Sequence, residues 1–320
     1  MMKKLLLLFL LCSIASSAQD FTNLDNTVKN YPKYRSPQQL ADRISKDFSS
    51  DLDRVRASFK WITNNIRYNL EEAQQPSRTV IQFRYSSEKE RLEKIQQIKD
   101  NIVKEAFFSK KGVCEEYAQS LKKLCDLLGI EAEVLTGYVR NTAYEINRVP
   151  NTSNHAWNAV KIDNKWIIID ATWSSGHVIN GRWLKEFNSY YFNIDYNKIG
   201  HTHYTDNRKW NIILNQDSLQ EFYSQPIYGK EFLRKDMEVV SPKSGTINTK
   251  GGETIILKIK NLKPHNKVYY GLMGDQYSKK PIVTFNNNIA SISIIAPQKN
   301  MELYLFVDKE LALEYKIAVR

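Results

Sequence analysis

The spacing of apolar residues changes near Ile130 in this chain of 320 residues. Before that point, apolar residues recur every three or four positions, which predicts amphipathic helices in three segments: 51–68, 86–108 and 114–128. Ser87 and Glu90 form a capping box at the start of the second segment, and Gly129 supplies a stop after the third. After Ile130 the apolar residues form short runs, which predicts β-strands at 132–139, 154–162 and 166–172.

The C-terminal part of the chain, from residue 241 to residue 320, has the pattern of an all-β domain. Turns rich in Gly, Pro and Asn separate four predicted strands: 254–259, 267–272, 290–295 and 302–307. Helices followed by strands predict an α+β fold with helices packed on an antiparallel sheet, and the all-β tail predicts a C-terminal β-sandwich. We place the α+β domain at residues 19–238 and the sandwich at residues 239–320.

Residues 1–18 have the organisation of a secretory signal peptide. Lys3 and Lys4 precede an apolar run that is too short to span a bilayer, and residues 16–18 are small, as a cleavage site requires. Cys12 follows a leucine rather than a small residue, which argues against a lipoprotein. No later segment is apolar enough to cross a membrane. We therefore expect an exported protein, periplasmic or extracellular, without a transmembrane segment.

The chain is basic, with 46 Lys and Arg residues against 35 Asp and Glu residues and a formal net charge of +11. It stays basic after Lys3 and Lys4 are removed with the signal peptide. A basic exported protein can lie against an anionic cell-envelope surface, and an evenly spread, solvated charge is the simpler interpretation. Because no segment alternates basic and aromatic residues, we expect no nucleic-acid partner.

Two cysteines, Cys114 and Cys125, remain after the predicted signal peptide. They lie eleven residues apart in one predicted helix, so a rise of roughly 16 Å separates them. A disulfide requires Cα atoms within about 7 Å, so these two cysteines cannot be bridged while the helix is intact. Cys125 falls on the apolar face of the helix and is best interpreted as a core residue.

Cys114 is the candidate nucleophile because it opens the predicted helix. The N–H groups at a helix start have no intrahelical partner, and together with the helix dipole they favour a thiolate. The backbone N–H of Cys114 is also placed to stabilise an oxyanion, and Gly112 would let the backbone approach a substrate carbonyl. Taken alone, a cysteine such as Cys114 is more often a small core residue than a nucleophile.

The strands that contain His155 and Asp170 predict a base oriented by an acid. If Asp163-Asn164 is a two-residue hairpin turn, Asp170 faces Trp157 and His155 faces Thr172. His155 and Asp170 are then diagonal neighbours on one face of the ladder, about 7–8 Å apart at the backbone, within reach of their side chains. A shift of register by one residue would put them on opposite faces. To complete a catalytic site, this base and acid need only a thiol from a helix packed on the same face of the sheet.

Each of these residues also has an ordinary structural interpretation: a histidine in a strand is usually a hydrogen-bonded polar residue, and Asp170 could end a strand. Cys114 is placed at a helix start, and His155 and Asp170 are placed on one face of the ladder. Together these placements favour the catalytic interpretation of the three residues. His201 and His203 flank a threonine and suggest a metal, but no cysteine or acidic cluster completes such a site. We expect these two histidines to be structural or to contact substrate, and we expect no metal or cofactor.

Around these positions the chain resembles the transglutaminase-like superfamily, and within it the kyphoscoliosis-peptidase-like branch. The resemblance runs from about residue 50 to residue 235. It is carried by these stretches: Phe59-Lys60-Trp61-Ile62, Ile66-Arg67-Tyr68, Gly112-Val113-Cys114-Glu115-Glu116-Tyr117-Ala118, Leu124-Cys125, Leu128-Gly129-Ile130, Gly137-Tyr138-Val139, His155-Ala156-Trp157-Asn158, Asp170-Ala171-Thr172-Trp173, Tyr191-Phe192, His203, Lys209-Trp210 and Ile212-Ile213-Leu214.

The resemblance implies a papain-like core with Cys114 as nucleophile, His155 as base and Asp170 as orienting acid, and similar proteins often carry an immunoglobulin-like β-sandwich. It implies an exported thiol acyl-transfer enzyme that acts on amide or carboxamide groups of a protein or peptide substrate, by hydrolysis or by amine transfer. No acidic loop resembles the calcium sites of animal transglutaminases, so calcium dependence is not expected. The alternative is a non-catalytic cell-envelope scaffold that uses the same fold for binding.

Overall fold

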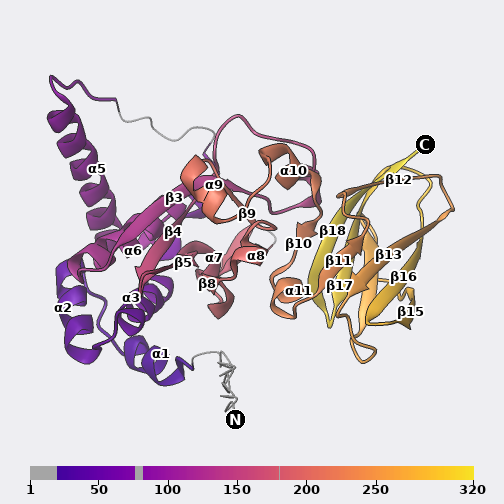
Figure 1. Cartoon of the computed structure of the whole chain (residues 1–320), viewed down its shortest axis with the longest axis horizontal. Helices are drawn as coiled ribbons and strands as arrows, with labels where there is room; N and C mark the ends of the chain where they lie inside the picture. The colour runs from indigo at the N-terminus through magenta and orange to yellow at the C-terminus, as the bar shows by residue number, and fades with distance from the viewer. Residues whose placement is uncertain (1–19, 76–81, 180) are drawn as a thin grey trace, which may run out of the picture.

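The structure is a computed structural model of the chain and describes residues 20–75, 82–179 and 181–320. The predicted signal peptide lies outside the described residues. Within the described residues, no helix combines the length and the apolar character that crossing a bilayer requires. Figure 1 shows a helical and mixed part joined to an all-β part that carries the C-terminus.

Five helices form the first layer of the N-terminal part: α1 (Thr22–Lys29), α2 (Pro37–Asp47), α3 (Asp51–Asn65), α5 (Glu88–Ser109) and α6 (Cys114–Leu127), with the short α4 (Leu70–Ala73) between them. The predicted helices correspond to α3, α5 and α6. The hydroxyl of Ser87 accepts a hydrogen bond from the N–H of Glu90 and caps α5. The Glu90 carboxylate accepts from the N–H of Ser86 rather than of Ser87, so only half of the predicted capping box is present. Gly129, with a φ of +73°, terminates α6.

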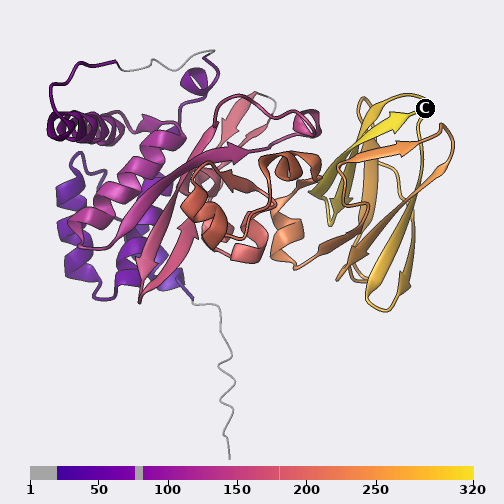
Figure 2. The ribbon, with the colours of Figure 1, turned by 45° about the horizontal axis from the view of Figure 1, so that its top comes forward.

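A five-stranded antiparallel sheet packs against α6, with its strands in the order β8-β5-β4-β3-β9. Its strands are β3 (Ala132–Val139), β4 (His155–Ile162), β5 (Lys165–Ile169), β8 (Phe192–Ile194) and β9 (His203–Thr205). Helix α6 packs on one face, and the short helices α8 (Tyr196–Ile199) and α9 (Arg208–Ile213) lie on the other (Figures 1 and 2). Helices packed on an antiparallel sheet are the predicted α+β arrangement.

The C-terminal part is built from two sheets that enclose one apolar core. One sheet has the order β10-β18-β17-β14, with β12 added in parallel to β18, and the other has the order β11-β13-β16-β15. The strands are β10 (Ile227–Tyr228), β11 (Glu238–Ser241), β12 (Thr246–Thr249), β13 (Thr254–Lys260), β14 (Val268–Leu272), β15 (Ile282–Asn286), β16 (Ile289–Ile295), β17 (Met301–Val307) and β18 (Glu310–Val319). The four predicted strands match β13, β14, β16 and β17 to within one residue at each end.

The two parts are connected by hydrogen bonds as well as by the chain. Strand β10 pairs with β18, with Ile227 opposite Glu314. The N–H of Ala143, in the loop that precedes β4, donates to the Glu314 carboxylate at 2.7 Å. Helix α11 (Lys230–Arg234) contributes Phe232 and Leu233 to the sandwich core. The last strand of the chain therefore contacts the loop that leads to His155.

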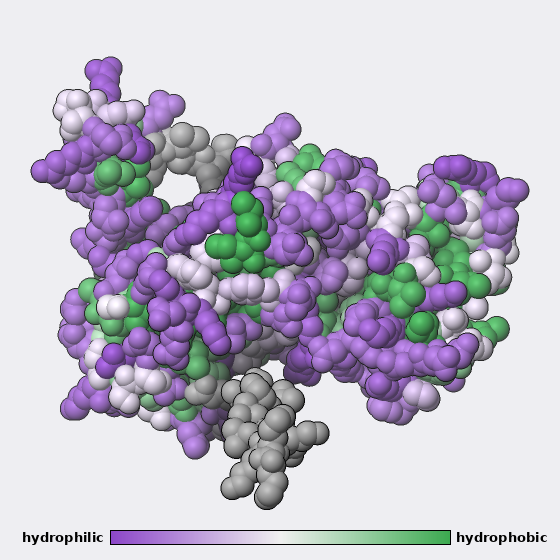
Figure 3. Space-filling view, in the orientation of Figure 1, coloured by the Kyte–Doolittle hydropathy of each residue, from purple (hydrophilic) through white to green (hydrophobic). Residues whose placement is uncertain are grey.

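The remaining elements are short: β1 (Arg67–Tyr68) pairs in parallel with β2 (Lys111–Gly112), and β6 (His177–Ile179) pairs with β7 (Arg182–Leu184). Helices α7 (Ala171–Ser175) and α10 (Leu219–Ser224) and the 3-10 turns η1 (Ala143–Glu145) and η2 (Ser189–Tyr191) complete the fold. In Figure 3 the visible face is mostly hydrophilic, with separate apolar patches that include some over the sandwich.

Candidate active site

Cys114 is the first residue of α6, as the sequence predicts, and only 2% of its surface is exposed. The Glu116 side chain folds back and accepts a hydrogen bond from the N–H of Val113 at 2.8 Å, which fixes the start of the helix. A Cβ added at Gly112 would come within 2.4 Å of the Cβ of Glu116. Gly112 therefore makes room for this cap, which is a different use from the substrate approach suggested by the sequence.

The predicted hairpin register is present. Asn158 pairs with Ile169 and Ile162 with Lys165, and the turn residues Asp163 and Asn164 both have positive φ, as a two-residue hairpin turn of this kind requires. The ladder is shorter than predicted, because β5 ends at Ile169 and the chain then enters α7. The predicted strand pairings of His155 with Thr172 and of Asp170 with Trp157 are therefore wrong.

Asp170 ends the strand because its side chain caps α7. Its Oδ1 accepts a hydrogen bond from the N–H of Trp173 at 2.9 Å. Its Oδ2 lies 2.7 Å from Nε2 of His155, so the predicted base and acid are in direct contact. Asp170 is fully buried and His155 is 8% exposed. The cap and the contact with His155 use different oxygens of one carboxylate, which leaves it little freedom to rotate.

The nucleophile helix does not pack on the predicted face of the sheet. Ala156 packs with Cys114 and Ala118 of α6, and the side-chain amide of Asn158 donates to the carbonyl of Ala118 at 3.0 Å. Trp157 belongs to the core on the opposite face. His155 and Trp157 are two positions apart on β4 and so belong to the same face of the sheet, which α6 does not cover. The expectation of a thiol on that face is therefore wrong. His155 reaches Cys114 because it is the first residue of β4, where the sheet ends.

The His155 ring lies between the thiol and the carboxylate. Because Nε2 faces Asp170, Nδ1 is the nitrogen left for the hydrogen bond between the ring and the Cys114 side chain. Burial lowers the pKa of His155, but the neighbouring Asp170 and Cys114 side chains outweigh burial and raise it to about 10. Burial raises the pKa of Asp170, but His155 and then His203 hold it well below its ordinary value. The Asp170 carboxylate therefore stabilises the imidazolium that forms when His155 accepts a proton.

His203 is the residue whose role the sequence did not reveal. It lies on β9, which pairs with β3, and its Nε2 lies 3.0 Å from Oδ2 of Asp170. Its Nδ1 lies 2.8 Å from the hydroxyl of Thr202. His203 therefore has an acidic neighbour that its surroundings in the sequence did not indicate. His201 takes no part, because its Nδ1 faces the side chain of Gln225 at 3.0 Å.

The side chains of His155, Asp170 and His203 bring three potential metal ligands within 4.8 Å of one another. Both histidine nitrogens approach the same oxygen, at 2.7 and 3.0 Å. Two ligand atoms on a tetrahedral zinc ion with bonds near 2.0–2.1 Å would be roughly 3.3 Å apart. The observed separations are shorter and match hydrogen bonds, so we interpret the cluster as a hydrogen-bonded network.

Aromatic rings surround this network. The rings of Trp157 and Trp173 lie 6.0 and 5.8 Å from the ring of His155, and Trp173 lies 4.7 Å from His203. Trp157 is 1% exposed. These rings keep water away from the carboxylate, which strengthens its interactions with both histidines.

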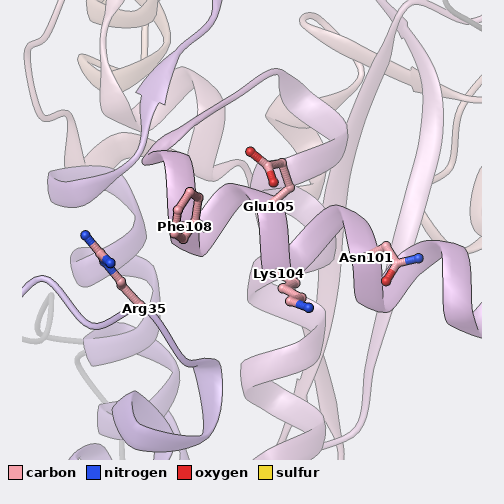
Figure 4. Close-up of a pocket in the computed structure, with 5 residues that line it drawn as sticks. All are labelled: Arg35, Asn101, Lys104, Glu105 and Phe108. Carbon is pink, nitrogen blue, oxygen red and sulfur yellow. The ribbon is translucent and has the colours of Figure 1, made fainter.

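A separate hollow of about 530 Å³ lies between Arg35 and the C-terminal half of α5. Figure 4 shows its lining, where the Arg35 guanidinium lies 5.2 Å from the centre of the Phe108 ring. The other lining residues are Asn101, Lys104 and Glu105. None of these side chains is a thiol, hydroxyl or imidazole, so this hollow is separate from the site at Cys114.

The chain is similar to several known proteins. Residues 38–171 match the family model of the transglutaminase-like superfamily. The human kyphoscoliosis peptidase is 26% identical over 247 residues, which cover 76% of this chain and 34% of that protein. The mouse kyphoscoliosis peptidase is 27% identical over 239 residues, which cover 74% of this chain and 33% of that protein. The chain thus spans about a third of the length of these relatives.

Among solved structures, a TGase is 19% identical with a TM-score of 0.31, covering 57% of this chain and 40% of the other chain. The resemblance noted in the sequence is therefore confirmed by the family model and by the two peptidases. The chain carries a domain of the transglutaminase-like superfamily, and kyphoscoliosis peptidases are among its relatives.

Proposed function

We propose that this protein is a thiol acyl-transfer enzyme with Cys114 as nucleophile, His155 as general base and Asp170 as the residue that orients the base. One observation carries the proposal: the Cys114 thiol at the start of α6 is hydrogen bonded to an imidazole whose other nitrogen is held at 2.7 Å by a buried carboxylate. A nucleophile, a base and an orienting group in this order define covalent acyl transfer.

In the proposed reaction, His155 takes the thiol proton and the Cys114 sulfur attacks the carbonyl carbon of an amide or carboxamide. The N–H of Cys114, at the helix start, stabilises the negative charge on the carbonyl oxygen. The C–N bond then breaks as the His155 imidazolium returns a proton to the nitrogen, which releases an amine or ammonia and leaves a thioester on Cys114. Attack on the thioester by water completes hydrolysis, and attack by an amine completes transfer.

Hydrolysis is the proposed main outcome, because water is always present while an amine acceptor has to bind. The proposed substrates are proteins or peptides, in line with the peptidase names of the relatives. We also propose that the enzyme works outside the cytoplasm, against an anionic cell-envelope surface. The leader pattern of residues 1–18 and the basic composition support this location. Sequencing the N-terminus of the secreted protein tests it, with a start near Gln19 expected and an uncleaved chain as the contrary result.

The test of the chemistry compares the wild type with Cys114→Ala and with Cys125→Ala as a matched control. Cys125 lies on the same helix but is fully buried in the core, so its loss should leave the chemistry intact. We expect iodoacetamide to label the wild type and Cys125→Ala at Cys114, and Cys114→Ala to lose both labelling and turnover. Mass spectrometry of a peptide library distinguishes cleaved, deamidated and amine-linked products.

Two results would count against the proposal. Full turnover by Cys114→Ala would remove Cys114 from the reaction. If no peptide is changed, and if a variant with all three residues replaced still binds cell-envelope material like the wild type, the protein is a binding scaffold.

A further inference from the structure

We propose that His203 is a positioning residue for this site: as a neutral imidazole, it donates a hydrogen bond to Asp170 and keeps that carboxylate directed at His155. The inference deepens the proposed function. It rests on a second histidine that meets the same carboxylate oxygen as the candidate base, from a strand that is distant in the sequence.

The hydrogen-bonding pattern determines which nitrogen of His203 carries the proton. The carboxylate of Asp170 can only accept, so Nε2 of His203 is the donor at 3.0 Å. The hydroxyl of Thr202 lies 2.8 Å from Nδ1 and 3.3 Å from the carbonyl of Ile199, and with Nε2 as the protonated nitrogen its single proton is donated to the nearer Nδ1. Burial lowers the pKa of His203, and the nearby Asp170 only partly offsets burial, which agrees with a neutral ring. His155 becomes charged when it accepts the thiol proton, while His203 supplies a neutral donor.

The donors around Asp170 account for its orientation. Oδ1 accepts the N–H of Trp173, and Oδ2 accepts one hydrogen bond from each histidine. The other titratable groups that act on this carboxylate are Tyr117 and Tyr191, and burial raises the pKa of both, so they stay neutral. Without His203, Oδ2 would keep a single donor in a fully buried position.

His203 also limits how tightly Asp170 holds the proton of His155. Two donors on one oxygen share its negative charge, so each interaction is weaker than it would be alone. The general acid that protonates the leaving nitrogen must be able to release its proton. Removal of His203 should therefore shift the pKa of His155 upward, while the carboxylate loses part of its restraint. Both effects slow the chemical steps. Because His203 is fully buried, it has no part in substrate binding.

The experiment compares His203→Leu, His203→Gln and, as a matched control, His201→Leu. A glutamine amide can donate to Asp170 and accept from Thr202, while a leucine can do neither. His201 is the neighbouring histidine and bonds to Gln225 instead of Asp170. All variants are first checked for folding by circular dichroism and thermal unfolding. Then kcat, KM and the pH profile of iodoacetamide labelling at Cys114 are measured.

We expect His203→Leu to lower kcat by roughly 10–100-fold with little change in KM, as replacements of residues that orient a reactive group do. The alkaline limb of its labelling profile should move to higher pH. His203→Gln should stay within about threefold of the wild type, and His201→Leu should leave kcat and the labelling profile unchanged.

The labelling profile needs no substrate, so it separates this inference from the proposed function. If the wild type turns over no peptide but His203→Leu shifts the profile and His203→Gln restores it, the role of His203 stands and the proposed reaction fails. A folded His203→Leu variant with wild-type kcat and profile would overturn the role of His203. A His203→Gln variant as impaired as His203→Leu would also overturn it, because the hydrogen bond to Asp170 would then not explain the effect. A raised KM at unchanged kcat would indicate a substrate contact instead, which also overturns it.

Discussion

Replacement of Asn158 by aspartate tests the connection between the helix of Cys114 and the strand of His155. Asn158 is fully buried on β4, and its side-chain amide donates to the carbonyl of Ala118 at 3.0 Å and to the carbonyl of Glu133 at 3.4 Å. Ala118 lies one turn after Cys114 in α6. An aspartate at this position has nearly the same shape but faces two oxygens to which a carboxylate cannot donate.

The cost follows from the protonation state of the new side chain. In the folded Asn158→Asp variant, the introduced carboxyl must stay protonated so that its O–H can donate to Ala118. The ordinary pKa of aspartate is about 3.9, roughly three units below pH 7, and each unit corresponds to about 1.4 kcal/mol. Asn158→Asp should therefore destabilise the fold by about 4 kcal/mol at pH 7.

The pH dependence is the sharper test. The folded pKa of the new carboxyl is raised above the unfolded value, so its contribution to stability is complete below about pH 4 and is lost as the pH rises. Relative to the wild type, the loss of stability in Asn158→Asp should grow by about 1.4 kcal/mol per pH unit between about pH 4 and pH 7. Urea unfolding at several pH values measures it.

Asn158→Leu is the control, because leucine has a similar volume and no charge. It removes the hydrogen bonds to Ala118 and Glu133 without adding a charge, which costs about 1 kcal/mol per bond at every pH. If the two variants show the same loss of stability at every pH, the carboxyl of Asn158→Asp is not buried against Ala118, and the proposed connection between α6 and β4 is refuted.

Two further changes test other parts of the fold. Burial raises the pKa of Glu314 to about 7 from an ordinary 4.5, so the stability that its protonated form provides is complete below pH 4.5 and is lost as the pH rises through 7. Glu314→Gln still accepts from Ala143, and its stability in urea unfolding should lack this pH dependence, which is worth roughly 3 kcal/mol. If the stability of the wild type and of Glu314→Gln changes equally with pH, Glu314 is solvated. A Cβ at Gly137 would lie 2.1 Å from the carbonyl of Tyr204, so Gly137→Ala should push β9 away from β3 and lower the unfolding midpoint, while an unchanged midpoint would contradict this close packing.

The parts of the site that were predictable are the local ones. Cys114 opens α6 because the apolar spacing of the helix begins there, and Gly129 ends it. His155 and Asp170 meet because a two-residue turn sets the register of the strands on either side of it. In each case the residues that decide the structure are neighbours in the sequence, so periodicity and turn chemistry suffice.

The contacts that were not predictable connect distant segments. His203 meets Asp170 because β9 pairs with β3, and no local pattern in the sequence specifies that pairing. Strand β18 was not predicted either. It is a central strand, bonded to β17, β10 and β12, and Glu314 and Lys316 interrupt its apolar pattern because they bond to the loop before β4.

The sequence by itself determined the order of helices and strands, the place of Cys114 at a helix start and the approach of His155 to Asp170, because these depend on spacing along a few consecutive residues. Only the tertiary structure decided which face of the sheet α6 covers, how His155 reaches the thiol around the end of that sheet, and which third side chain holds the carboxylate. Those choices depend on how whole surfaces pack, and packing brings together residues whose separation in the sequence carries no signal.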